Sequence, residues 1–225
     1  MFEAQTLITA NPNSKVVPIF LLPGDEWAFE TELCALAARY PSKTFLICCF
    51  EIDGPTFRTS KAPLGYPNLR VRYGKPAANI HLVYANAEFG TSNKVLARYF
   101  SHLPELLIQA EQCPRFVWAD FCCWPSYEAI STLTNDLRKG DRIFSTFSLN
   151  WDRNKLGQGV SPCLWTQAQQ DKSRSYGWHT ARFIASRAGP LARRNASGLR
   201  QITSVEYTGD SGNKVPMLIS GFEVC

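Results

Sequence analysis

Strand-sized apolar runs alternate along this chain with segments that have the apolar spacing of helices. The first two runs are Val16–Leu22 and Lys43–Ile52, and Glu26–Tyr40 between them has apolar residues at helical intervals. Three further runs continue the pattern, at Ile80–Ala85, Phe116–Phe121 and Arg142–Leu149. Continuous apolar strands joined by helices require a mostly parallel sheet with both faces covered. The alternation therefore predicts an α/β fold.

The end of the chain departs from this alternation. Leu199–Tyr207 and Val215–Val224 are strand-like and are joined by a stretch rich in turn residues, which predicts an antiparallel hairpin. We expect one domain over residues 1–225, built on a Rossmann-like sheet of seven strands in which only the last strand is antiparallel. Residues 1–15 are expected to be an N-terminal extension, and residues 54–79 and 150–171 long loops. Further helices are predicted over Asn93–Gln112, broken or bent near Pro104, and over Tyr127–Arg138.

The chain has eight cysteines, but their positions do not predict disulfides or zinc. Cys48–Cys49 and Cys122–Cys123 lie inside apolar runs, and the sequence contains no C-x-x-C motif and no cysteine–histidine cluster. Buried free thiols in a reducing compartment are the better interpretation, so we expect a cytoplasmic protein without a metal. No apolar run approaches the length of a membrane span, and the first residues lack the pattern of a signal peptide.

Positive charge is concentrated near the C-terminal end. Lys172–Arg200 contains seven basic residues and no acidic one, whereas the rest of the chain has 17 basic and 19 acidic residues. Aromatic residues such as Tyr176 and Trp178 lie among these charges, and nucleic-acid binding uses charges for phosphates and rings for unpaired bases. The residues predicted to bind nucleic acid are Arg174, Arg182, Arg187, Arg193 and Arg194. The alternative is a solvated helix with a flexible loop.

Ligands of such sheets bind at the carboxyl ends of the strands. In this chain those ends carry Leu22-Pro23-Gly24, Glu51, Asn86-Ala87 and Asp120-Phe121. An acidic residue in the position of Glu51 can accept hydrogen bonds from both hydroxyls of a ribose. The alternative for Glu51 is a solvated strand end.

Five α/β units closed by a hairpin, with an acidic residue after the second strand, resemble the class I S-adenosylmethionine-dependent methyltransferases, including divergent proteins of phages and plasmids. The resemblance implies S-adenosylmethionine as the cofactor. It assigns the methionine moiety to Leu22, Pro23 and Gly24, the ribose to Glu51, and adenine to Asn86 and Ala87. Asp120 would hold the cofactor's amino-acid part or accept hydrogen bonds from a substrate amine, and Phe121 would stack on a base.

Two departures from that family leave other functions open. The glycine-rich turn of the first strand is reduced to Gly24, and Asp120-Phe121-Cys122-Cys123 matches only the beginning of the [DN]-P-P-[YF] motif of amino-methylating enzymes. The sequence is therefore compatible with a methyltransferase that acts on nucleic acid. It is also compatible with a methyltransferase-like binding module for nucleic acid or protein that has weak or no catalysis. A nucleotide-dependent oxidoreductase is disfavoured because G-x-G-x-x-G is missing.

Overall fold

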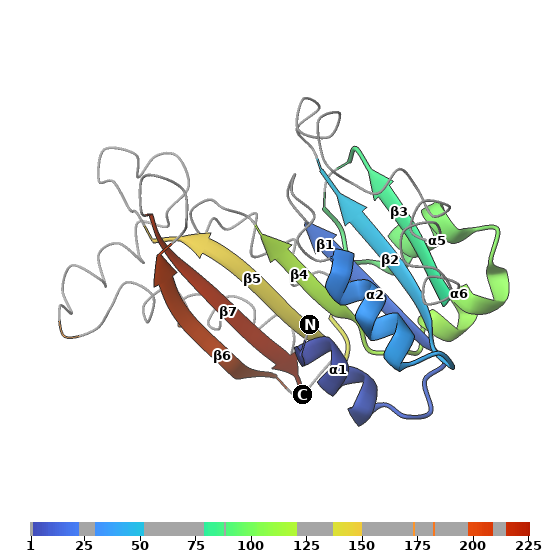
Figure 1. The fold of residues 1–225 in the computed structure, drawn as a ribbon, viewed down its shortest axis with the longest axis horizontal. Helices are drawn as coiled ribbons and strands as arrows, with labels where there is room; N and C mark the ends of the chain where they lie inside the picture. The colour runs from blue at the N-terminus through green and yellow to red at the C-terminus, as the bar shows by residue number, and fades with distance from the viewer. Residues whose placement is uncertain are drawn as a thin grey trace. The chain divides into compact units, whose positions relative to one another are not determined.

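Figure 1 shows the fold in a computed structural model of the chain. The structure describes residues 2–22, 30–51, 79–87, 89–120, 137–149, 173, 182, 198–208 and 215–225. The chain packs as two compact units. The first comprises Met1–Trp118 with Gly140–Arg142, and the second comprises Ala119–Lys139 with Ile143–Cys225. That residues 1–225 act as a single domain stays a prediction.

Seven strands form a sheet with the order β3-β2-β1-β4-β5-β7-β6. The strands are β1 (Val16–Leu22), β2 (Thr44–Phe50), β3 (Ile80–Ala85), β4 (Phe116–Asp120), β5 (Arg142–Ser148), β6 (Leu199–Thr208) and β7 (Pro216–Val224). From β1 the chain adds β2 and β3 in one direction and then resumes with β4 on the other side of β1. This reversal of strand order is characteristic of Rossmann-like folds. The predicted α/β fold with seven strands and a C-terminal antiparallel pair is confirmed.

The described helices are α1 (Phe2–Ala10), α2 (Glu30–Arg39), α5 (Asn93–Phe100) and α6 (Pro104–Ala110). The helix predicted to be broken or bent near Pro104 is broken: α5 ends at Phe100, and Pro104 begins α6. Proline is tolerated there because the first amide of a helix has no partner within the helix. All seven strands begin and end within two residues of their predicted bounds. The helix predicted over Tyr127–Arg138 lies almost entirely outside the described residues.

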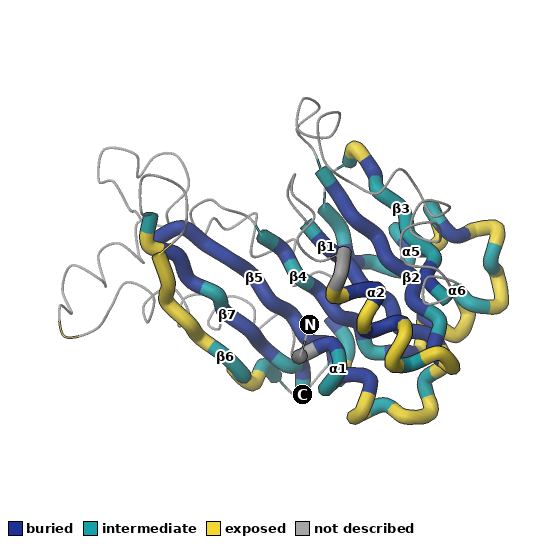
Figure 2. The backbone as a smooth tube through the Cα atoms, viewed as in Figure 1, coloured by how far each residue is buried: buried dark blue, intermediate teal, exposed yellow. Residues whose placement is uncertain are grey.

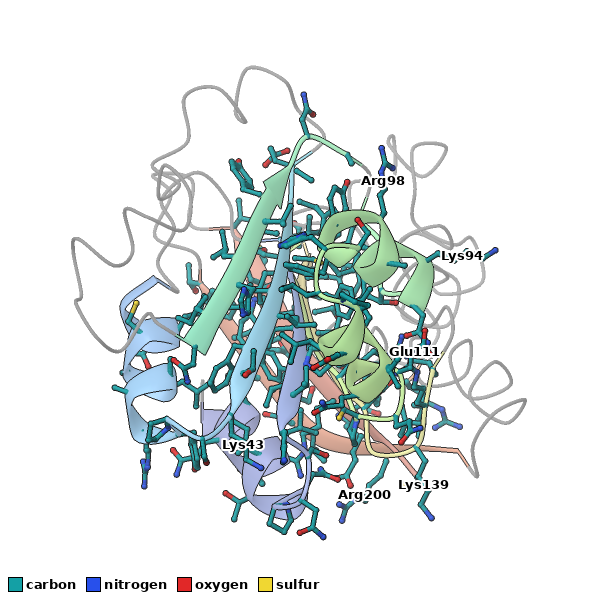
Figure 3. The ribbon with its side chains drawn as sticks, turned by 90° about the vertical axis from the view of Figure 1, so that its right-hand side faces the viewer. Lys43, Lys94, Arg98, Glu111, Lys139 and Arg200 are labelled. Atoms are coloured by element: carbon teal, nitrogen blue, oxygen red, sulfur yellow. The ribbon has the colours of Figure 1, made fainter. Side chains whose placement is uncertain are left out.

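The first unit has its core around β1 and β2, which run parallel and are almost wholly buried. Helix α2 covers one face of the strands, and α5 and α6 cover the other (Figure 3). Leu33, Leu36 and Ala37 of α2 are buried, as predicted from their helical spacing. Two covered faces explain why β1 and β2 are continuously apolar instead of alternating with polar residues.

Residues 1–15, expected to be an N-terminal extension, contain a helix. Phe2–Ala10 form α1, and its side chains Ala4, Leu7 and Ile8 are buried. Their spacing of three and four residues places them on one face of the helix. The Nζ of Lys43, which is itself buried, donates hydrogen bonds to the carbonyls of Pro12 and Ser14. These bonds fix the turn between α1 and β1.

The second unit contains β5 from Ile143 onward and the β6–β7 hairpin, and β5 is buried throughout. Strand β7 is mostly buried whereas β6 is mostly exposed (Figure 2). The antiparallel register is shifted between Gln201 and Thr203, which indicates a β-bulge. Gly221 lies against the ring of Phe144, and a Cβ at this position would be 2.7 Å from both Phe144 Cδ1 and Thr203 Cγ2. Only glycine allows this close approach.

Candidate functional site

Three parallel strands of the first unit end at one edge of the sheet. The register pairs Leu21 of β1 with Cys49 of β2, and Phe50 of β2 with Ala85 of β3. The next residues, Leu22, Glu51 and Asn86, therefore follow one another along the carboxyl edge. The structure thus brings together four of the residues predicted to bind the cofactor, because Ala87 adjoins Asn86.

Glu51 is held at this edge by the neighbouring strand. Its main-chain N–H donates a hydrogen bond to the carbonyl of Ala85, 3.0 Å away, so the ladder between β2 and β3 extends one residue beyond β2. Glu51 and Ala87 are half-buried and Asn86 is exposed. A carboxylate acceptor and an amide with both donor and acceptor groups consequently lie side by side and reach solvent.

An aromatic cluster forms around Phe50, the residue before Glu51. The buried ring of Phe50 meets Phe89 edge-to-face, with centroids 5.5 Å apart and planes at 84°. Phe50 also contacts Tyr99 of α5 at 6.3 Å and 66°. Edge-to-face aromatic pairs contribute stability in addition to that gained from burying their apolar surface. The cluster holds Phe89 against β2, and no pattern in the sequence pointed to Phe89 or Tyr99.

A buried arginine holds the same segment from its other end. Nη1 of Arg115 donates a hydrogen bond to the carbonyl of Thr91, and both residues are buried. Arg115 precedes β4, whereas Thr91 lies between Phe89 and the start of α5 in the sequence. The segment from Asn86 to α5 is therefore anchored at both ends. The sequence offered no signal for this contact, because the two residues are 24 positions apart.

The other residues predicted for the site either belong to the second unit or lie outside the described residues. Asp120 ends β4 and is half-buried, and it belongs to the second unit. Pro23 and Gly24, assigned to the methionine moiety, lie outside the described residues, and so does Phe121. Their roles stay predictions.

The basic segment is described at only a few positions. Arg182 is exposed and helical, whereas Arg174, Arg187, Arg193 and Arg194 lie outside the described residues. Arg200, at the end of the segment, donates from Nη2 to Glu223 Oε2 at 2.6 Å across the β6–β7 hairpin. One of the seven positive charges is thus compensated by a neighbouring carboxylate.

The two adjacent cysteines of β2 are buried thiols. Cys34, Cys48, Cys49 and Cys113 are buried and form no disulfide among the described residues, as predicted, whereas Cys225 is half-buried. Cys122 and Cys123 lie outside the described residues. Burial raises the pKa of the Cys48 and Cys49 thiols far above the ordinary value, so they stay protonated and are poor nucleophiles. Among the described residues, no three His, Cys, Asp or Glu side chains cluster as metal ligands.

No helix in the described part of the chain is both long and apolar enough to cross a membrane.

Among known proteins, the chain is similar only to proteins found by comparison with solved structures. No protein-family model matches the chain, and no curated protein matches it. The chain is similar to geranyl diphosphate C-methyltransferase from Streptomyces coelicolor A3(2), solved with Mg²⁺, geranyl diphosphate and S-adenosyl-L-homocysteine. That match has 9% identity and a TM-score of 0.42, and it covers 100% of this chain and 77% of the other.

Two further methyltransferases are similar at the same level. A mutant of the 16S rRNA (adenine(1408)-N(1))-methyltransferase from Catenulisporales acidiphilia has 10% identity and a TM-score of 0.38, covering 98% of this chain and 90% of that one. The antibiotic-resistance methyltransferase Kmr has 13% identity and a TM-score of 0.33, covering 96% and 92%.

Proposed function

We propose that this chain is an S-adenosylmethionine-dependent methyltransferase that acts on nucleic acid. The observation that carries the proposal is the position of Glu51 beside Asn86 and Ala87 at the carboxyl edge of parallel strands. The strand order reverses at the neighbouring β1. In open α/β sheets, ligands bind outside the carboxyl ends of the strands at such a reversal.

The residues at this edge fit an adenosine group. The carboxylate of Glu51 can accept hydrogen bonds from both ribose hydroxyls, and the amide of Asn86 can pair with the edge of a base. Ala87 is small and leaves room beside that base. Leu22, the last residue of β1, begins the turn that the sequence resemblance assigns to the methionine moiety, together with Pro23 and Gly24.

The chemistry requires few reactive side chains. The bound cofactor supplies an activated methyl group on a sulfonium, so the chain itself has to bind and orient the acceptor. The sequence resemblance assigns to Asp120 the acceptance of hydrogen bonds from a substrate amine, and to Phe121 a stacking surface for a base. Neither role requires a metal or a thiolate nucleophile, in keeping with the protonated state of Cys48 and Cys49.

A polyanionic substrate is supported by the charge distribution. The segment Lys172–Arg200 contains seven basic residues and no acidic one, so the segment itself supplies no carboxylate to neutralise them. Basic residues that neutralise phosphates provide most of the sequence-independent affinity for nucleic acid.

The test is methyl transfer from S-adenosylmethionine that carries a labelled methyl group, with DNA, RNA and protein offered separately. The proposal expects label in DNA or RNA and none in protein. Cofactor binding without transfer to any acceptor would favour the binding-module alternative. Label in protein alone would show that the substrate assignment is wrong, and binding of NAD in place of S-adenosylmethionine would favour an oxidoreductase.

A further inference from the structure

Helix α5 presents two cations to solvent. Lys94 and Arg98 are exposed and one helical turn apart, so their side chains lie on the same face. No acidic residue occurs in α5, and neither cation makes an ion pair with any described residue. By contrast, the described cations Arg115 and Arg200 are both paired with carboxylates. The exposed face of α5 therefore carries positive charge that no described carboxylate compensates.

This charge lies close to the proposed cofactor edge. The guanidinium carbon of Arg98 is 5.4 Å from the ring centroid of Tyr99, within the range of a cation–π contact. Tyr99 in turn contacts Phe50, the residue before Glu51. Two ring contacts thus connect Arg98 to the strand that carries Glu51. Figure 3 shows Lys94 and Arg98 pointing away from the body of the protein, with Arg98 at the end towards which β3 runs.

We propose that Lys94 and Arg98 form a phosphate-binding surface for the sugar–phosphate backbone of the nucleic-acid substrate. The inference rests on the proposed function and adds a surface within the first unit, separate from Lys172–Arg200. The planar guanidinium of Arg98 can donate two parallel hydrogen bonds to one phosphate. Because the contact with Tyr99 already limits the orientations of this side chain, less conformational freedom is lost when phosphate binds. Lys94 adds a point charge one turn away. The ligand chemistry is a phosphodiester chain, which DNA and RNA share.

The experiment measures binding of labelled single-stranded DNA and RNA of one sequence over a series of salt concentrations. The variant K94Q/R98Q removes both charges from surface positions. Each phosphate neutralised on a single strand contributes about 0.7 to the slope of log affinity against log salt, so the slope should become shallower by about 1.4. The nucleic acid that shows this change, DNA or RNA, identifies the source of the phosphates.

The matched control is K15Q/R39Q, which removes the same charge from the first unit. Lys15 precedes β1 and Arg39 ends α2, so both lie at the amino ends of the strands, and both are exposed. The proposal expects the slope of this control to equal that of the parent. An unchanged slope in K94Q/R98Q, or equal changes in both variants, would overturn it.

Cofactor binding separates this proposal from the proposed function. Titration with S-adenosylmethionine should give the same affinity for K94Q/R98Q and the parent. If the parent binds S-adenosylmethionine but neither nucleic acid, the phosphate surface is wrong while the cofactor assignment stands. If the parent binds nucleic acid through Lys94 and Arg98 but not S-adenosylmethionine, the surface stands and the methyltransferase assignment fails.

Discussion

Arg115 and Asp141 form an ion pair in which the two side chains are only 1% and 0% exposed. Nε of Arg115 donates to Asp141 Oδ2 at 3.0 Å, Nη2 donates to the same oxygen, and the main-chain N–H of Arg115 donates to Oδ1 at 2.8 Å. Because Arg115 precedes β4 and Asp141 precedes β5, the pair ties together the starts of two strands. Through Thr91 it also reaches the segment that leads into α5.

Removing one partner of this pair should be strongly destabilising. Asp141→Ala leaves a buried guanidinium without its carboxylate, and loss of one partner of a buried pair costs about 3–5 kcal/mol. Urea denaturation measures this free energy of unfolding. The control is Glu223→Ala, whose partner Arg200 is 64% exposed, and the expected loss there is much smaller because solvent screens the charge. Equal losses in the two variants would contradict a structural role for the buried pair.

Lys43 should stabilise the first unit through its ammonium group and not through its aliphatic stem. Its Nζ donates to the carbonyls of Pro12 at 2.6 Å and Ser14 at 2.5 Å. Lys43→Met retains most of the stem but leaves these carbonyls without the charged donor, and hydrogen bonds to a charged group contribute about 1.5–3 kcal/mol. Thermal or urea unfolding of Lys43→Met should show a loss of this order. A variant as stable as the parent would mean that water replaces the ammonium at no cost.

The contact between Gly221 and Phe144 predicts an overpacking defect. In Gly221→Ala the new methyl group must displace the ring of Phe144 or the Cγ2 of Thr203, and overpacking of this kind costs about 1–3 kcal/mol. The cost should be smaller in a Phe144→Leu background, because the smaller side chain leaves room. A double-mutant cycle from denaturation curves measures this coupling. Strict additivity would show that Phe144 does not restrict the site.

The thiols of β2 should be unreactive in the folded protein. Burial raises the pKa of Cys48 above its ordinary value of 9.0, and burial together with the neighbouring Cys48 raises that of Cys49. Alkylation at pH about 8.5 followed by peptide mass spectrometry should find both residues unmodified until denaturant is added. Labelling of the native protein would contradict the burial of β2.

The same pKa shifts make the stability of the folded protein depend on pH. The folded state holds these protons more tightly than the unfolded state does, so the contribution is complete below pH 9.0 and declines as the unfolded thiols ionise above it. Stability measured by urea denaturation should therefore fall as the pH rises through 9. Replacing both cysteines with alanine should remove this part of the fall.

The strands could be predicted from the sequence because buried parallel strands are continuous apolar runs. These runs are shorter than a typical helix, so their length identifies them as strands. The break between α5 and α6 could be predicted from Pro104, because proline interrupts a helix. Helix α1 was not predicted, although Ala4, Leu7 and Ile8 have helical spacing, because the pattern is confined to a helix of only 9 residues. Local pattern carries little information when tertiary packing supplies most of the stability of a short helix.

Only those residues of the candidate site that lie at the carboxyl ends of strands could be predicted from the sequence. Glu51, Asn86 and Ala87 were identified because parallel strands bring their carboxyl ends to one edge. The rings of Phe89 and Tyr99 could not be placed beside Phe50, because side-chain packing between β2 and α5 leaves no periodic signal in the sequence. The link from Arg115 to Thr91 likewise depends on tertiary structure.

The proposed cofactor site depends on the carboxylate of Glu51, which would bind the ribose of S-adenosylmethionine. Calorimetric titration of the cofactor into the parent, Glu51→Ala and Glu105→Ala tests it most directly, since Glu105 is an exposed carboxylate on α6. Loss of hydrogen bonds to a charged group costs about 1.5–3 kcal/mol, so Glu51→Ala should bind about ten- to a hundredfold more weakly, and Glu105→Ala should bind like the parent. Equal affinity in Glu51→Ala and the parent, or no binding by the parent, would contradict the account.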